Sequence, residues 1–394
     1  MAGGSEVLTT AEPVVARRSI FRPPVHLLEP LLIPLAAILV AFVIFGLFVL
    51  LNGKNPIQTF QLLYRGSFGT AYSIQNTLVR SAPLMLTALC VALPLQLGMV
   101  IIGGEGALVL GGLTAAGVAH TLPDSMNPYT ADFIMAGAGM AVGGVWIAIP
   151  GFLKYYRGVN ETISSLLLNY VAIAVLNEMV EGWMHDPTSL NTPSTYTVSD
   201  AVHIANIGDT LTGWDWFNNH ASQRMQDLAN NLFGEVHWGL VWGVILCVLL
   251  FILMNHTVIG FAAKIVGGNM RAARIAGLSV GVITVLLCII AGACAGLAGV
   301  FEVGAVQGAA NANLYSSGYG YTGILVAFIA RGNPLGIIPV AILLGAIGAG
   351  NYMLQSHQGL PDATVLVFQG ILFMVILAFE TMYGRFAIFR RKEA

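Results

Sequence analysis

The fold is decided by residues 82–119, which read APLMLTALCVALPLQLGMVIIGGEGALVLGGLTAAGVA. Glu105 is the single charged residue of this stretch, and Gly103, Gly104 and Gly106 surround it. A transmembrane helix needs about 20 mostly apolar residues, so residues 73–119 are long enough for two spans. The glycines permit a broken backbone, which the membrane interior tolerates only where it is buried in protein or lines an aqueous cavity.

The composition of the whole chain agrees with a membrane protein. Its 394 residues are 56% hydrophobic and 9% charged, with a mean hydropathy of +0.78 and a net charge of −2. Soluble domains carry about 25% charged residues, so soluble enzymes, disordered proteins and nucleic-acid binders are disfavoured. The four cysteines lie in apolar runs, and the eight histidines form no metal-binding motif. We therefore expect no disulfide, no metal and no cofactor.

Apolar stretches along the chain predict an all-α, polytopic membrane helix bundle with about ten transmembrane helices. Residues 319–330 form the shortest of these stretches. The predicted spans are 31–51, two within 73–119, 132–153, 166–184, 237–256, 282–306, 319–330, 336–354 and 363–383.

The basic residues predict the orientation, because Lys and Arg concentrate on the cytoplasmic side. With ten spans and both termini cytoplasmic, all of the 17 basic residues lie inside except Lys54, Arg65, Arg80 and Arg224. Parity therefore supports an even number of spans. The resulting organisation is a cytoplasmic tail 1–30, a membrane domain 31–384 with an external loop 185–236 and a cytoplasmic loop 257–281, and a cytoplasmic tail 385–394.

Two carboxylates within apolar runs are candidates for a functional site. An ionisable residue inside a membrane is costly and is by default a functional candidate, which favours Glu105 as part of a transport path. The alternative is structural, with Glu105 accepting hydrogen bonds from the free N–H groups of the next helix. Glu302 ends another uncharged run, and we expect it at the outer interface.

The cytoplasmic loop contains a predicted short helix. Asn269 is a good N-cap, the alanines at 272, 273 and 276 favour helix, and Gly277 is a natural stop. Arg271 and Arg274 are three positions apart and share a face. The helix could lie on anionic membrane lipid headgroups, or it could dock a cytosolic partner.

The sequence contains no P-loop, so an energy source for transport must be an ion gradient or a partner protein. An ion-coupled carrier that uses Glu105 is one alternative. A membrane-embedded enzyme is disfavoured, since no cluster of nucleophile, base or metal ligands is apparent.

Four stretches resemble the permease subunits of ATP-binding-cassette importers for simple sugars, nucleosides and branched-chain amino acids. Residues 102–106, IGGEG, are similar to the signature N-I-G-x-E-G-Q, with Ile101 in place of Asn and Ala107 in place of Gln. Residues 159–170, VNETISSLLLNY, resemble a stretch typical of the nucleoside-like branch. Residues 268–277, GNMRAARIAG, and residues 318–336 resemble two further family motifs.

This resemblance implies a transport subunit that works with several partners. Cytosolic ATPase subunits would supply the P-loops, a second permease chain (identical or paralogous) would complete the path, and an extracytoplasmic solute-binding protein would deliver cargo. Residues 269–277 would form the coupling helix, with Ala272 and Ala273 packing into an ATPase groove and Arg271 and Arg274 pairing with its acidic rim.

The resemblance also implies the cargo and the membrane. The cargo would be a nucleoside or related purine compound, with a simple sugar as the alternative, in a bacterial cytoplasmic (inner) membrane. Tyr319 could stack on a base, although aromatic residues at helix ends are more often interfacial anchors. The predicted path residues are Glu105, Asn169, Gln307, Asn313 and Tyr319.

Overall fold

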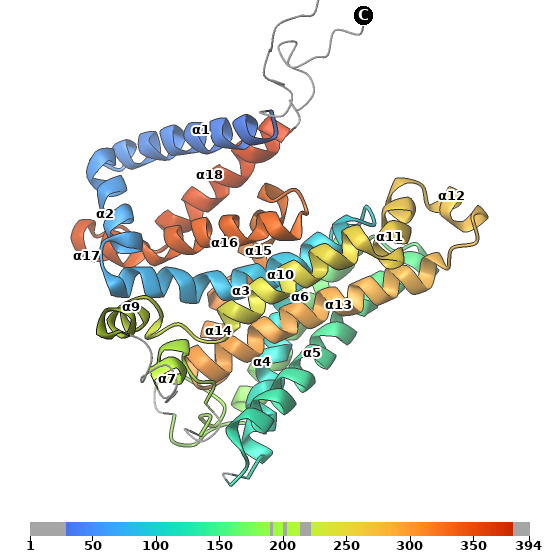
Figure 1. Cartoon of the computed structure of the whole chain (residues 1–394), viewed down its shortest axis with the longest axis horizontal. Coiled ribbons are helices and arrows are strands. Elements are labelled where there is room, and N and C mark those ends of the chain that lie inside the picture. The colour runs from blue at the N-terminus through green and yellow to red at the C-terminus, as the bar shows by residue number, and fades with distance from the viewer. Residues whose placement is uncertain (1–28, 124, 190–191, 200–202, 213–221, 381–394) are drawn as a thin grey trace, which may run out of the picture.

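A computed structural model describes residues 29–123, 125–189, 192–199, 203–212 and 222–380. The regular secondary structure of these residues is helical (Figure 1), which confirms the all-α prediction. The predicted tails lie outside the described residues apart from residues 29 and 30, as do parts of the predicted external loop.

The helices follow one another with short connections along most of the chain. In chain order they are α1 (Glu29–Leu51), α2 (Pro56–Phe68), α3 (Ala71–Leu95), α4 (Gly104–Thr121), α5 (Pro128–Phe152), α6 (Glu161–Glu181), α7 (Ile207–Thr212), α9 (Gln223–Phe233), α10 (Gly239–His256), α11 (Val258–Gly268), α12 (Met270–Ile275), α13 (Val280–Phe301), α14 (Asn313–Ser316), α15 (Tyr319–Ile329), α16 (Pro334–Ala349), α17 (Asn351–Gln358) and α18 (Ala363–Glu380). Two π-helical turns, η2 (Leu153–Arg157) and η3 (Glu302–Gln307), continue α5 and α13.

Several of these helices are long and apolar enough to cross a membrane, so the protein is a multi-pass membrane protein. Within the described residues there are six such segments, and the bent pair α1 and α2, 116° apart, meets the same criterion together. Of the other predicted spans, α15 has 11 residues, or about 17 Å at ~1.5 Å per residue, which is about half of a ~30 Å hydrocarbon core. The count of ten spans stays a prediction. The six segments are Ala71–Leu95, Pro128–Arg157, Glu161–Glu181, Gly239–His256, Val280–Gln307 and Pro334–Gln358.

Close backbone packing of α5 against α13 forms one wall of the bundle. A Cβ atom at Gly143 would lie 2.7 Å from Cα of Gly296, and one at Gly292 would lie 2.8 Å from the carbonyl carbon of Gly143. Small residues at four-residue spacing allow this approach. Because lipid is as apolar as the helix surfaces, helices in a membrane associate mainly through van der Waals contacts. Gly143, Gly292 and Gly296 therefore serve helix packing.

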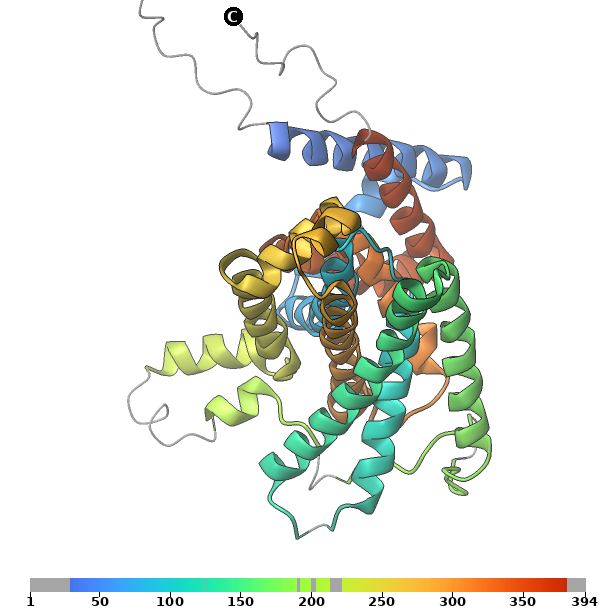
Figure 2. The ribbon, with the colours of Figure 1, turned by 90° about the vertical axis from the view of Figure 1, so that its right-hand side faces the viewer.

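Helix α3 lies at the centre of the bundle. It is the most enclosed candidate span, because 78% of its apolar 18-residue stretch is buried. It packs against α10, α13, α15 and α16. On the outside of the bundle, α1 packs against α18, where the Phe45 and Phe368 rings stack with centroids 4.3 Å apart. The two predicted loops lie apart: α12 is at one end of α10 and α13, while α7 and α9 are at the other end (Figures 1 and 2).

Candidate functional site

Glu105 lies in the first turn of α4 and is completely buried. Its Oε2 atom accepts a 2.6 Å hydrogen bond from the backbone N–H of Gly320, in the first turn of α15. The carboxylate therefore lies between the N-terminal ends of two helices, where free N–H groups carry partial positive charge. Its other oxygen, Oε1, is buried and has no hydrogen-bond partner among the residues that the structure describes.

A non-helical segment, residues 99–103, precedes α4 and leaves backbone groups without helical partners. One face of α6 satisfies them. Thr162 Oγ1 donates to the Val100 carbonyl at 2.8 Å, and Ser165 Oγ accepts from the Ile102 N–H at 3.0 Å. Asn169 Nδ2 donates to the Ile102 carbonyl at 2.9 Å. Such satisfaction is what a broken backbone inside a membrane requires.

Asn169 also connects α6 directly to α4. Its Oδ1 atom accepts a 2.8 Å hydrogen bond from the N–H of Gly106. A Cβ atom at Gly106 would lie 2.9 Å from this Oδ1 and 2.9 Å from Nε1 of Trp146 on α5, so only glycine lets the three helices meet here. Trp146 Nε1 is itself buried, with no hydrogen-bond partner in the described part of the chain. We call Glu105, Gly106, Asn169 and Gly320 the Glu105 junction.

Two of the other predicted path residues lie on α15 and α14. Tyr319 is half-buried at the start of α15, next to the Glu105 junction, and its carbonyl accepts a 3.0 Å hydrogen bond from Thr87 Oγ1. Asn313 is exposed on α14, where its N–H donates to Asn311 Oδ1 at 2.8 Å. The Glu105 junction thus brings Glu105 and Asn169 together, with Tyr319 adjacent to Gly320.

Gln307 lies in η3, the π-helical continuation of α13, and its Nε2 donates to Glu302 Oε1 at 3.0 Å. Glu302 is only 4% exposed. Glu302 is therefore enclosed by protein, and its expected depth at the outer membrane interface stays a prediction. The hydrogen bond from Gln307 provides a polar partner inside the protein, which the apolar run before Glu302 does not reveal.

Sequence reasoning did not identify Gly320 as a member of the Glu105 junction, nor Thr162 and Ser165 as hydrogen-bond partners of the segment 99–103. The spacing of Thr162, Ser165 and Asn169, three and four positions apart, places them on one helical face. This spacing by itself predicts a polar face on the helix. Nothing in the sequence pairs Gly320 with Glu105, because they are 215 positions apart.

The predicted helix of the cytoplasmic loop is present as α12. Asn269 is its N-cap, and its Oδ1 accepts hydrogen bonds from the N–H groups of Arg271 at 3.0 Å and Ala272 at 3.1 Å. Gly277 follows the helix with φ of +80°, a left-handed conformation that favours glycine. Both ends of the predicted helix are confirmed.

The outward face of α12 differs from the predicted one at a single position. Ala273 is fully buried within the chain, whereas Arg271, Ala272 and Arg274 are exposed. The prediction that Ala273 packs into a partner is wrong for this structure, because its side chain faces the protein's own core. Ile275, which sequence reasoning did not single out, is 88% exposed.

The Arg274 side chain contacts an aromatic ring of the same chain. Its guanidinium carbon lies 5.8 Å from the ring centroid of Tyr155 in η2, within the range of a cation–π interaction. The exposed helix α12 is therefore attached to the end of α5.

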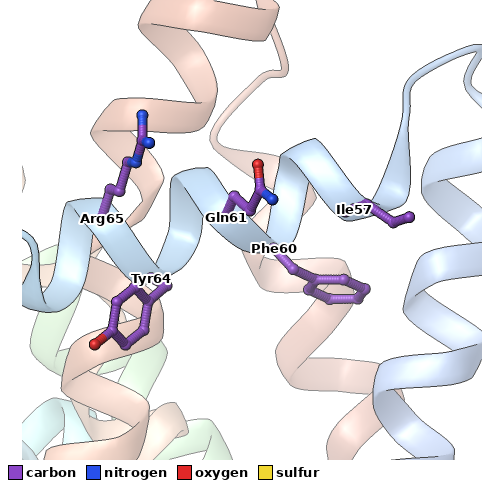
Figure 3. A pocket seen from close by; sticks show the side chains of 5 residues that line it. All are labelled: Ile57, Phe60, Gln61, Tyr64 and Arg65. Atoms are coloured by element: carbon purple, nitrogen blue, oxygen red, sulfur yellow. The ribbon is translucent and has the colours of Figure 1, made fainter.

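Two hollows lie away from the Glu105 junction. One, of about 460 Å³, runs along α2 and is lined by side chains from that single helix, with Gln61 and Arg65 on one side and Phe60 and Tyr64 on the other (Figure 3). The other, of about 470 Å³, lies between α5, α10 and α13 and is mostly apolar, with Asp132 on its wall. Among the residues that the structure describes, no group of three His, Cys, Asp or Glu side chains could hold a metal ion.

Comparisons with known proteins connect this geometry to a family. The chain is 28% identical to a glucose ABC transporter permease protein of Haloferax volcanii, over 88% of this chain and 87% of the relative. It is 27% identical to a guanosine ABC transporter permease protein of Bacillus subtilis, over 93% and 98%. It is 28% identical to a nucleoside ABC transporter permease protein of Lactococcus lactis, over 92% and 96%. No solved structure gives a significant match to the chain.

The family comparison covers most of the chain and includes the whole Glu105 junction. A family model described as "Branched-chain amino acid transport system / permease component" matches residues 73–377. This range begins near the start of α3 and ends within α18. The chain therefore belongs to the family of branched-chain amino acid transport system permease components.

Proposed function

We propose that this permease subunit of an ATP-binding-cassette importer forms the translocation path for a nucleoside or a related purine compound. Homologues are permease subunits and not enzymes, and ATP hydrolysis lies in separate subunits. Two of the three relatives are named for guanosine or nucleosides, which supports this cargo. The relative named for glucose makes a simple sugar the second candidate.

The observation that carries the proposed path is the Glu105 junction. Helices α4 and α15 both start inside the bundle, and their N-terminal ends meet at Glu105. Transporters commonly build cargo sites where broken helices end near the middle of the membrane. We propose that Glu105 holds α15 in place and that Asn169 and Tyr319 border the path, with Gln307 and Asn313 farther along it.

A base could stack at the exposed side of this region. Tyr321 lies one helical position beyond Gly320 and is 40% exposed. Aromatic rings stack on nucleobases with little dependence on base identity, so Tyr321 could stack on the base of a nucleoside.

We propose the membrane arrangement that the charges predict. It comprises ten spans, both termini in the cytoplasm of a bacterium, an external loop at 185–236 and a cytoplasmic loop at 257–281. The positions of α12 and of α7 and α9 at opposite ends of α10 and α13 support this assignment (Figure 1). The proposed site is the bacterial cytoplasmic (inner) membrane.

The proposed partners follow from the family. Cytosolic ATPase subunits would dock on α12, whose exposed face carries Arg271, Ala272, Arg274 and Ile275. A second permease chain would complete the path, and a solute-binding protein would dock on the external side. The exposed N-cap residue Asn269 would set the start of the docking helix.

The cargo and the energy source can be tested together. The complete importer, purified with its own ATPase and binding protein, is reconstituted in proteoliposomes, and uptake of radiolabelled guanosine, adenosine and glucose is measured. We expect ATP-dependent uptake of a nucleoside that excess glucose does not compete. Glucose uptake without nucleoside uptake would establish the sugar alternative. Uptake driven by a proton gradient without ATP would instead establish an ion-coupled carrier.

A further inference from the structure

The proposed docking helix α12 contacts a side chain at the end of α5, in addition to the burial of Ala273 in the core. Tyr155 of η2 faces Arg274 of α12 at 5.8 Å. The same ring packs on the start of α13, because a Cβ atom at Gly281 would lie 2.8 Å from Tyr155 Cδ1. One half-buried aromatic ring therefore contacts both the docking helix and the span that follows it.

The turn that carries Tyr155 is π-helical and ends at Gly158, whose φ is +69°. Such wide turns occur mostly as single turns at functional positions in helices. A wider turn rotates its side chains relative to those of a regular α-helix. The direction in which Tyr155 points therefore depends on this π-helical turn.

The residue before Tyr155 connects η2 to α6. Lys154 Nζ lies 2.8 Å from Oε2 of Glu161, the first residue of α6. The Glu161 side chain is 10% exposed and that of Lys154 is 35% exposed. An ion pair enclosed to this degree is less screened by water and salt than one on an open surface.

Helix α6 then leads to the Glu105 junction. Thr162, one residue beyond Glu161, donates a hydrogen bond to the Val100 carbonyl in the non-helical segment 99–103, and Asn169 accepts one from the Gly106 N–H. Glu105 in turn holds Gly320. A displacement of the start of α6 is therefore transmitted by hydrogen bonds to both helix ends at the buried carboxylate.

We propose that Tyr155 and the Lys154–Glu161 ion pair are positioning residues that connect the docking helix α12 to the Glu105 junction. This inference rests on the proposed function, in which an ATPase moves α12. When α12 moves, Arg274 shifts Tyr155, the ion pair shifts the start of α6, and α6 moves the segment that carries Glu105. The connection adjusts access to the path without contact with cargo.

A competing route runs through the backbone alone. The N–H of Leu278 donates to the Ala273 carbonyl at 3.1 Å, and α13 begins two residues later at Val280. Movement of α12 along this route would reach α13 directly and then α5 through their glycine contacts. The two routes differ in whether the Tyr155 side chain is needed.

The test measures cargo uptake and ATP hydrolysis in the same proteoliposomes of the complete importer. Tyr155→Leu removes the aromatic face, Tyr155→Phe keeps it, and Tyr352→Leu changes a tyrosine that is 70% exposed on α17. We expect Tyr155→Leu to lower uptake per ATP hydrolysed about fivefold or more, while Tyr155→Phe and Tyr352→Leu stay near the wild type. Equal ratios for Tyr155→Leu and the wild type would establish the backbone route and overturn the proposal.

The ion pair provides a second measurement that does not depend on the Tyr155 variants folding. Lys154→Glu and Glu161→Lys should each lower uptake per ATP, and the double variant, which restores the pair in reverse, should recover most of the loss. A double variant no better than the single ones overturns the role of the pair.

The docking assignment has its own control. Arg271→Glu changes a residue of α12 that is exposed on the proposed docking face, and co-purification of the ATPase is the readout. If the ATPase binds this variant normally and coupling is unchanged, the docking assignment is wrong. If Arg271→Glu disrupts binding while Tyr155→Leu leaves uptake per ATP unchanged, only the connection proposed here is wrong.

Discussion

The backbone N–H of Gly320 donates a 2.6 Å hydrogen bond to Oε2 of Glu105, 215 positions earlier in the chain. This contact aligns the first turns of α4 and α15, two helices that begin inside the bundle. Because the carboxylate is fully buried, neither group can replace its partner with bulk water. If the two helix ends separate, the Glu105 carboxylate therefore needs another hydrogen-bond donor, or it must become protonated and lose its negative charge.

Gly320→Ala should destabilise the protein and lower transport. The new Cβ atom would lie 2.6 Å from Glu105 Oε2, so α15 must move away. Overpacking of this kind costs about 1–3 kcal/mol. The free energy of unfolding in detergent micelles measures the effect. Gly370→Ala on α18 is the matched control, because nothing lies within 4 Å of the added atom. Equal stability of the two variants would contradict the close packing at Gly320.

Glu105→Gln and Glu105→Ala should separate the hydrogen bond from the charge. The Gln side chain keeps an oxygen that can accept from Gly320, so the variant should remain assembled and retain ATP-driven uptake. Ala leaves that N–H buried and unpaired, at a cost of about 1–3 kcal/mol. Unfolding and uptake are measured in parallel. Loss of uptake in Glu105→Gln at wild-type stability would show that the negative charge itself is needed.

Asn169→Ala should loosen the start of α4. The substitution removes the acceptor for the Gly106 N–H and the donor to the Ile102 carbonyl. Each buried backbone group left unpaired costs about 1–3 kcal/mol. Hydrogen exchange of residues 99–106 should rise, whereas Gln223→Ala on the exposed side of α9 should leave it unchanged. Unaltered exchange in Asn169→Ala would mean that water or another side chain replaces the amide.

Asn269→Ala should weaken α12 without unfolding the bundle. The N-cap side chain accepts hydrogen bonds from two N–H groups of a six-residue helix. Loss of such a cap costs about 1 kcal/mol, and a helix this short has little else to hold it. We expect weaker co-purification of the ATPase and normal thermal unfolding of the permease. Asn269→Ser keeps a capping oxygen and should bind the ATPase nearly as well as the wild type.

Ile275→Glu tests the exposed apolar position that only the structure revealed. Ile275 is 88% exposed at the end of α12, so the permease alone should lose no packing. Burial of an Ile side chain against a partner contributes about 1.5–3 kcal/mol, so ATPase binding should weaken at least about tenfold. Co-purification and an ATPase titration measure this effect. Binding at wild-type strength would exclude Ile275 from the interface.

Much of the candidate site could be predicted from local patterns. The apolar runs predicted the helices, because each run must satisfy its own backbone hydrogen bonds in the membrane. The cap Asn269 and the stop Gly277 delimit α12 by local dihedral and hydrogen-bond preferences, which need no distant contact. The glycines around Glu105 likewise predicted a broken backbone, and residues 99–103 are non-helical.

Other features depend on which elements pack together. The burial of Ala273 and Glu302, the exposure of Ile275 and the hydrogen bond from Gly320 to Glu105 all depend on neighbours far along the chain. Periodicity could not supply them, since an apolar helix in lipid has no single hydrophobic face that identifies its partner.

By itself, then, the sequence determined the helices, their caps and the isolation of one carboxylate among glycines, because these follow from interactions within a few residues. Only the tertiary structure decided that Glu105, Asn169 and Gly320 meet and that Tyr155 contacts Arg274. The reason is physical: burial and hydrogen bonding between distant segments are properties of the packed bundle. They decide which polar groups hold the chain together and which remain on its surface for partners.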